Sequence, residues 1–115
     1  MTMDQIELKT VLADLTQKIS KLLGSNLDAV ILYGSYARGD NTADSDVDIM
    51  VLTSNNYLIN SATRAELNKI FSRTGLEHDL VISLVINDIG TFEQWLPVMP
   101  FYQNVRKEGV VLYAA

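Results

Sequence analysis

Two aspartates, Asp46 and Asp48, stand two residues apart in the apolar segment DVDIMVL (46–52). In an extended strand, residues at this spacing project from the same face, with their α-carbons about 6.6 Å apart. Two like charges that close repel each other and raise each other's pKa. A divalent cation removes this conflict, and Mg²⁺ prefers oxygen ligands completed by substrate phosphates. The pair therefore predicts a carboxylate clamp for Mg²⁺.

A glycine and a serine, Gly34 and Ser35, directly follow the apolar segment 27–33. Glycine lets the backbone turn sharply and expose N–H groups, and a serine hydroxyl can reach a phosphate oxygen. The segment is not a Walker loop, because Gly39 is followed by Asp40 rather than by Lys and Ser or Thr. Two interpretations stay open at this point: a phosphate-binding turn, or a tight turn that only caps a short helix.

The elements that must position these residues are predicted from the spacing of apolar residues. The expected helices cover about 4–23, 63–73, 88–96 and 98–107, and the expected strands cover 27–33, 46–52, 79–86 and 110–113. The first two strands are joined by too few residues for a full crossover helix, which favours a mixed over a purely parallel sheet. We therefore expect an α/β fold in which a small mixed β-sheet is flanked by helices.

Three local signals define the ends of the two long helices. Asp4 with Glu7, and Thr63 with Glu66, have the spacing of a capping box, which predicts helix starts at both places. Gly75 is expected to end the second helix.

The third expected strand, 79–86, alternates in the same way as the second. Asp79, Val81, Ser83 and Val85 share one face of it. Together with Met50 of the second strand, Val81 and Val85 are expected to form an apolar patch beside the aspartates, left partly open to water. Such a patch usually marks a binding surface.

Composition and charge exclude several classes of protein. A chain of 115 residues suits one domain, 1–115. Nine basic against fourteen acidic residues give a net charge of −5, which argues against broad nucleic-acid binding. Cysteine is absent, so disulfides and thiolate metal sites are excluded. The first ten residues carry Asp4 and Glu7 where an export leader would need a basic start and an apolar run, and apolar stretches fall short of about 20 residues. We therefore expect a cytoplasmic protein without membrane contact.

The acidic residues are concentrated around the two aspartates. Five acids and one base, Arg38, fall between positions 28 and 48, so this segment holds most of the net negative charge. Because two of these acids lie inside an apolar strand pattern, the concentration indicates a functional site rather than a solvated loop.

Taken together, Gly34-Ser35, ten intervening residues and Asp46-x-Asp48 form the segment GSYARGDNTADSDVDIMV. This segment resembles the signature of nucleotidyltransferases of the polymerase-beta superfamily, and in particular their minimal bacterial and archaeal members. The resemblance is strongest over 29–52, moderate over 77–86 and loose over 100–113.

The resemblance implies roles for the turn and its neighbours. Gly34 and Ser35 match the turn that holds the β- and γ-phosphates of the nucleotide. Arg38 either contacts a phosphate or pairs with Asp40 or Asp44.

The resemblance also implies a two-metal Mg²⁺ site with ATP as substrate. Asp46 and Asp48 match two of the metal-binding carboxylates. A third catalytic carboxylate is expected on the next strand, near the acceptor hydroxyl. Asp79 is the candidate, and Glu77 is the alternative.

Three functions stay open under this resemblance. The first is transfer of AMP from ATP to a hydroxyl. For family members of this size, the resemblance implies that this hydroxyl belongs to a tyrosine of a small helical HEPN-type toxin. The second is antibiotic nucleotidyl transfer, which usually needs a further helical domain. The third is a binding antitoxin of the same fold without catalysis. The expected partners are a nucleoside triphosphate and either a helical protein or a second copy of the chain. Trp95, Phe101 and Tyr102 are interpreted as core or interface residues rather than base-stacking groups.

Overall fold

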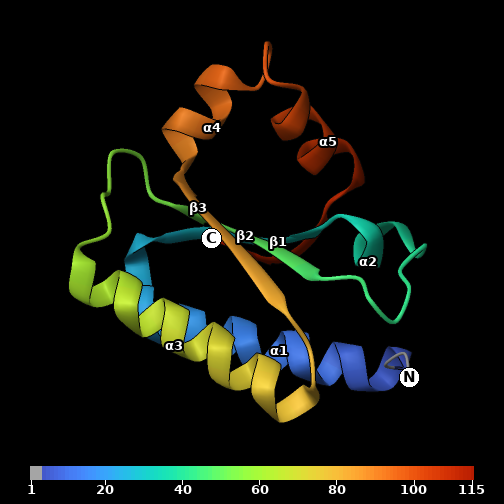
Figure 1. The fold of residues 1–115 in the computed structure, drawn as a ribbon. Coiled ribbons are helices and arrows are strands. Elements are labelled where there is room, and N and C mark those ends of the chain that lie inside the picture. Colours follow the sequence, from blue (N-terminus) through green and yellow to red (C-terminus); the bar gives the residue numbers. More distant parts are fainter. Residues whose placement is uncertain (1–3) are drawn as a thin grey trace.

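A mixed β-sheet forms the centre of the molecule in the computed structural model, which describes residues 4–115 (Figure 1). Residues 1–3, part of the segment considered above for an export leader, lie outside the described residues. The strands are β1 (Leu27–Tyr33), β2 (Val47–Thr53), β3 (Ile82–Asp88) and β4 (Val110–Ala114). Their order across the sheet is β3-β2-β1-β4.

The pairing of the strands confirms the expected mixed sheet. β1 pairs antiparallel with β2 and with β4, whereas β2 pairs parallel with β3. The connection from β1 to β2 contains only the short helix α2 (Ser35–Arg38), which cannot carry the chain back across the sheet. The connection from β2 to β3 contains the long helix α3 (Ser61–His78), as a parallel pair requires.

Helices cover both faces of the sheet. α1 (Gln5–Leu23) and α3 lie side by side on one face, below the sheet in Figure 1. α4 (Ile89–Trp95) and α5 (Pro100–Glu108) lie above the other face. The short helix α2 stands at the end of β1, beside the loop that leads into β2.

Alternating strand residues feed two separate hydrophobic cores. Val30, Ile49 and Val51 belong to the core under α1 and α3, where Leu15 and Ile19 of α1 are fully buried. The side chains between them point the other way, because residues alternate along a strand. Those side chains, which include Ile31, Met50 and Leu52, join Phe92 and Val105 in the core under α4 and α5.

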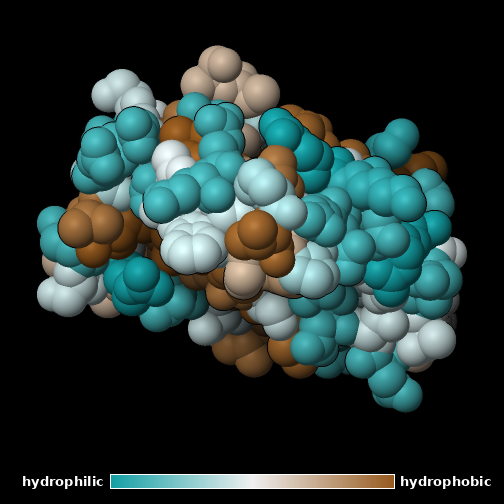
Figure 2. Space-filling model, turned by 90° about the horizontal axis from the view of Figure 1, so that it is seen from above, coloured by the Kyte–Doolittle hydropathy of each residue, from teal (hydrophilic) through white to brown (hydrophobic). Residues whose placement is uncertain are grey.

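The apolar patch expected around Met50 is not formed as predicted. Met50 is fully buried, because α4 and α5 cover this part of the sheet. Val85 is half-buried against the same core, and only Val81 is largely exposed. Seen from above α4 and α5, the surface is mostly hydrophilic, with separate hydrophobic groups among the polar ones (Figure 2).

The second long helix differs at both ends from the prediction. It begins after Asn60, whose side chain accepts a 2.8 Å hydrogen bond from the Thr63 amide, so Asn60 rather than Thr63 is the N-cap. At the other end the helix continues through Gly75 to His78. Gly75 is buried and lies directly under the Leu80 carbonyl, so a side chain there would block the chain from folding back.

Asp79 is consequently not a strand residue. It is the C-cap of α3 in the left-handed conformation, with φ 55° and ψ 49°, and β3 begins only at Ile82. The Leu80 amide donates a 2.8 Å hydrogen bond to the Gly75 carbonyl, which closes the turn. The local hydrogen bonds of a helix end therefore override the apolar alternation that predicted a strand from Asp79.

None of the helices between residues 4 and 115 has the length and apolar character that crossing a membrane requires.

Candidate active site

The turn after β1 places a glycine against an aspartate of the neighbouring strand. Tyr33, the last residue of β1, lies opposite Asp48 in the antiparallel register with β2. The next residue, Gly34, has φ 76° and ψ −155°, a conformation that is essentially restricted to glycine. A Cβ atom at Gly34 would collide with the carboxylate of Asp48. The Gly34 turn and the Asp48 carboxylate are therefore in direct contact, although 14 positions of sequence separate them.

Asp46 and Asp48 are close enough to interact through their charges. Partial burial raises the pKa of Asp48 above its ordinary value, the charge of Asp46 raises it further, and Arg38 lowers it. Asp46 is exposed and directly precedes β2, whose first residue Val47 donates a 2.9 Å hydrogen bond to the Val81 carbonyl of the β3 side. The structure therefore brings Asp46 close enough for its charge to act on Asp48.

The loop that leads into Asp46 is closed by its own hydrogen bonds. The Thr42 amide donates to the Ser45 hydroxyl at 2.9 Å, and the Ser45 amide donates to the Thr42 carbonyl at 3.1 Å. Ser45 therefore stabilises a turn, which fixes the direction from which the chain enters β2.

Arg38 is held by two carboxylates at the edge of the site. Its Nε donates to Asp40 at 3.2 Å, one of the two pairings that the sequence left open. Its Nη1 donates to Glu108 at the end of α5, also at 3.2 Å. The Glu108 contact joins residues 70 positions apart, and no local pattern in the sequence indicated it.

The structure does not bring the expected third carboxylate into one cluster with the pair. Among residues 4–115, no three His, Cys, Asp or Glu side chains are close enough to hold a metal ion together. Asp79 lines a hollow of about 320 Å³ with Asp44 and Asp46. Glu77 lies on α3, where it attracts Lys18 of α1, and it does not share a strand face with Asp79.

One strand residue at the level of Asp48 was not singled out from the sequence as a site residue. Ser83 of β3 lies opposite Asp48 in the parallel register, as Tyr33 does on the other side. The side chains of Tyr33, Asp48 and Ser83 therefore form a row on one face of the sheet. α4 and α5 cover another part of this same face. In the sequence, the alternation of the segment 79–86 places Ser83 on the same face as Asp79. Only the register of β3 against β2 shows that Ser83 lies opposite Asp48.

A hollow of about 280 Å³ adjoins the Gly34 turn. It is lined by Tyr33, Gly34, Arg38, Phe101, Asn104, Val105 and Glu108. Burial, and then the charge of Asp48, raise the pKa of the Tyr33 hydroxyl, so the phenol is neutral at physiological pH. This side of the site thus combines the aromatic rings of Tyr33 and Phe101 with the cation of Arg38. Arg38 is paired with two carboxylates, as described above.

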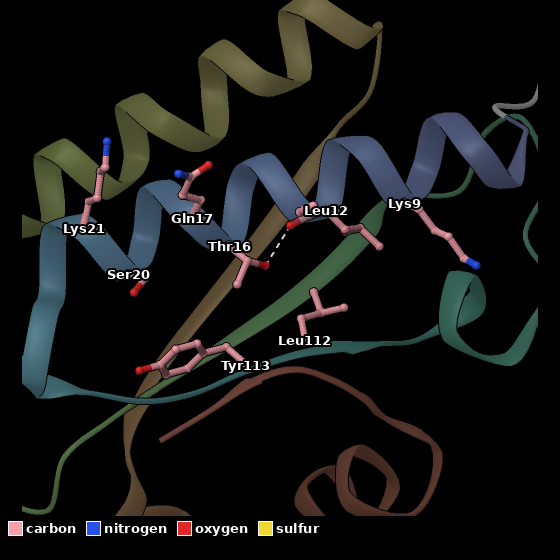
Figure 3. Close-up of a pocket in the computed structure, with 9 residues that line it drawn as sticks. Lys9, Leu12, Thr16, Gln17, Ser20, Lys21, Leu112 and Tyr113 are labelled. Carbon is pink, nitrogen blue, oxygen red and sulfur yellow. Dashed lines mark hydrogen bonds between the residues drawn. The ribbon is translucent and has the colours of Figure 1, made fainter.

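A larger hollow of about 730 Å³ lies on the opposite face of the sheet (Figure 3). In it, Leu12 and Thr16 of α1 face Leu112 and Tyr113 of β4, and the Thr16 hydroxyl donates to the Leu12 carbonyl at 2.7 Å. No carboxylate lines this hollow among the described residues. Because the sheet separates it from Asp48, it is not part of the carboxylate site.

The donor set fits Mg²⁺ together with a nucleotide. Mg²⁺ is usually bound by one or two carboxylates plus substrate phosphates rather than by a cage of protein ligands. Asp46 and Asp48 supply two carboxylates, and a cation between them would relieve the repulsion that raises the pKa of Asp48. The acids around Arg38 would also repel a free triphosphate, so the nucleotide and the cation are expected to bind together.

Comparison with known proteins defines the class to which this fold and site belong. The family model described as "Polymerase beta, Nucleotidyltransferase" matches residues 17–115. The chain therefore belongs to the polymerase-beta nucleotidyltransferase family, and it is a nucleotidyltransferase.

A relative and two solved structures are similar to this chain. "Putative protein adenylyltransferase MJ0141" of Methanocaldococcus jannaschii is 37% identical over 81 residues, which are 70% of this chain and 80% of the relative. A mutant of the toxin-antitoxin pair MntA-HpeT is 27% identical with a TM-score of 0.52, covering 87% of this chain and 72% of that chain. A toxin-antitoxin solved with AMP-PNP shares the fold, with a TM-score of 0.58 at 22% identity over 90% of this chain and 73% of that chain.

Proposed function

We propose that this nucleotidyltransferase, with Mg²⁺, transfers AMP from ATP to a tyrosine hydroxyl of a small helical partner of the HEPN type. The observation that carries the proposal is the contact between the Gly34 turn and Asp48, with Asp46 beside it. This contact supports the proposal because the turn that would bind the phosphates and the two carboxylates that would bind the metal lie at the same place.

The turn is suited to the phosphates of the nucleotide. The first N–H groups of a helix have no partner inside the helix. In α2 these are the amides of Ser35 and Tyr36, because the amides of Ala37 and Arg38 donate to the Gly34 carbonyl. In the proposal, these amides and the Ser35 hydroxyl hold the β- and γ-phosphates. Arg38 neutralises charge at the mouth of the site once phosphates compete with Asp40 and Glu108 for its guanidinium.

Asp46 and Asp48 would hold Mg²⁺, with Asp79 as the third carboxylate of the proposal. When bound, the metal lowers the pKa of the attacking hydroxyl and stabilises the leaving pyrophosphate. The hydroxyl oxygen of the acceptor bonds to the α-phosphorus while the bond from that phosphorus to the α,β-bridging oxygen breaks. The hydroxyl proton is released to water, and pyrophosphate leaves with the bridging oxygen.

The partner is proposed from the relatives. The M. jannaschii relative is named as a protein adenylyltransferase, and MntA-HpeT is a toxin-antitoxin pair. Because ATP is the donor, we place the reaction in the cytoplasm.

The experiment follows the label from ATP. The purified chain is incubated with Mg²⁺ and ATP labelled at either the α- or the γ-phosphate, with and without the product of the adjacent gene, which the proposal expects to be a small helical protein. The proposal expects α-label, but not γ-label, on a tyrosine of the partner, identified by mass spectrometry.

Two variants and a control decide the role of the carboxylates. Asp46→Asn and Asp48→Asn should abolish labelling, whereas Asp28→Asn, another strand aspartate, should leave it unchanged. If the two site variants still inhibit the partner fully and no label appears with the unaltered chain, the protein acts as a binding antitoxin instead. If the label appears on a small-molecule antibiotic but not on the partner, the acceptor class is wrong.

A further inference from the structure

The hollow beside the Gly34 turn is in the right place for the nucleoside end of the substrate. Gly34 lines this hollow and also contacts Asp48, so the hollow begins where the proposed phosphate site ends. Its volume is about 280 Å³, just below the range of about 300–1,000 Å³ that holds a whole drug-sized ligand. It therefore suits one part of a nucleotide, such as the base, rather than the entire molecule.

One face of α5 forms the far wall. Phe101, Asn104, Val105 and Glu108 all line the hollow, and their spacing of three, four and seven residues puts them on the same side of a helix. Val105 is buried against the sheet, which anchors this face. The wall is therefore a fixed part of the fold and not a loose loop.

The aromatic residues of the hollow offer a stacking surface. The rings of Tyr33 and Phe101 lie edge to face, with centroids 5.5 Å apart and an interplanar angle of 79°. Phe101 is nevertheless 40% exposed, so part of its ring is open. Flat bases stack on such rings regardless of their identity.

Asn104 supplies the group that can distinguish one base from another. Its side-chain amide carries one acceptor and a donor, which complement the N6 amino group and the N7 nitrogen of adenine. Guanine presents two acceptors on the same edge, so it leaves the amide oxygen unpaired. Asn104 is exposed and lines the hollow beside Phe101, one helical turn away along α5.

We infer that the hollow between α5 and the Gly34 turn is the nucleobase subsite, in which adenine stacks on Phe101 and hydrogen-bonds to Asn104. This inference rests on the proposed function, because it takes the phosphates to lie at Gly34 and Ser35. It reassigns Phe101, which the sequence placed among core or interface residues.

The test is calorimetric binding in Mg²⁺ of three unreactive probes: α,β-methylene-ATP, α,β-methylene-GTP and inorganic triphosphate. The unaltered chain should bind the ATP analogue at least about tenfold tighter than the other two. Asn104→Ala should reduce the ratio of the affinity for the ATP analogue to that for the GTP analogue by about tenfold. Phe101→Ala should weaken both analogues about tenfold, and neither variant should change the affinity for triphosphate.

Matched controls separate the subsite from the general effect of replacing an exposed helical asparagine or aromatic residue. Asn68→Ala, an exposed helical asparagine of α3, and Trp95→Ala, an exposed aromatic residue of α4 outside the hollow, should leave all three affinities unchanged. Far-ultraviolet circular dichroism should be the same for every variant.

The outcomes distinguish this inference from the proposed function. If triphosphate and the ATP analogue bind equally well, if Asn104→Ala keeps the full preference for the ATP analogue over the GTP analogue, or if Phe101→Ala leaves the affinity for both analogues unchanged, the subsite assignment is wrong. The transfer reaction and its dependence on Asp48 would then still stand. If none of the three probes binds in Mg²⁺, the proposed function fails and the subsite fails with it.

Discussion

The carboxylate of Asp48 occupies the space beside the α-carbon of Gly34 that any side chain would fill. The antiparallel register that puts Tyr33 opposite Asp48 creates this contact, because it carries the turn after β1 across the end of β2. Gly34 is therefore required twice, once for its positive φ and once for the room it leaves to Asp48.

Gly34→Ala is expected to reduce nucleotide transfer strongly, because the new methyl group must displace the Asp48 carboxylate. Gly24→Ala is the matched control: its φ is 55° and its ψ is −129°, close to the values at Gly34, but nothing lies within 4 Å of its Cβ position. Both variants should lose about 1–2 kcal/mol of stability from backbone strain. Thermal unfolding and transfer assays check the two effects, and equal loss of activity in both variants would contradict the proposed role of the contact.

Asp48→Asn should abolish transfer but not destabilise the metal-free protein. The substitution removes a like charge close to Asp46, and partial burial already disfavours the charged form of Asp48. We expect an unfolding temperature equal to or slightly above that of the unaltered chain, and a loss of activity of at least about 100-fold. A large fall in the unfolding temperature without metal would make Asp48 a structural residue instead.

Asp79→Gly should stabilise the protein while reducing transfer. Asp79 has φ 55° and ψ 49°, a left-handed conformation that glycine adopts without the steric cost of a Cβ atom. The expected gain is about 1 kcal/mol, or about 4 °C in unfolding temperature for a domain of this size. Asn56→Gly, at φ 64°, should give a similar gain with unchanged activity. If Asp79→Gly also keeps full activity, Asp79 is only a helix cap and not the third carboxylate.

The pH dependence of stability should contain a contribution from Asp88. Hydrogen bonds from the Thr91 hydroxyl at 2.6 Å and the Thr91 amide at 3.1 Å lower the pKa of this carboxyl. A carboxyl whose pKa is lower in the folded state stabilises that state above its unfolded pKa of about 3.9, and loses the effect as pH falls through the folded pKa. Asp88→Asn, which cannot titrate, should therefore unfold at a lower temperature at pH 7 and approach the unaltered chain towards pH 2. A difference that stays constant over this range would contradict the assignment.

Elements whose signals are local could be predicted from the sequence. The apolar spacing from Leu8 to Leu23 and the Asp4 cap predicted α1, and the Asp4 side chain accepts a 2.7 Å hydrogen bond from the Glu7 amide. The segment Leu27–Tyr33 is a strand as predicted. The family, too, followed from one short segment, because the residue types that do the chemistry are close together in the sequence.

Predictions from local patterns were wrong in two situations. In one, two local signals competed, and in the other the outcome depended on a distant segment that packs over the residue. Asp79 fits a strand by alternation, but the hydrogen bonds that close α3 over Gly75 make it a helix cap. Met50 was expected to be open, because the sequence does not show that α4 and α5 fold back over β2.

Only the tertiary structure decided which residues meet at the site. The contact of Gly34 with Asp48, the alignment of Ser83 with Asp48 and the pairing of Arg38 with Glu108 depend on strand register or on the docking of α5. Register and docking are set by how the whole chain buries its apolar surface, and this is a sum over distant residues that no window of sequence contains.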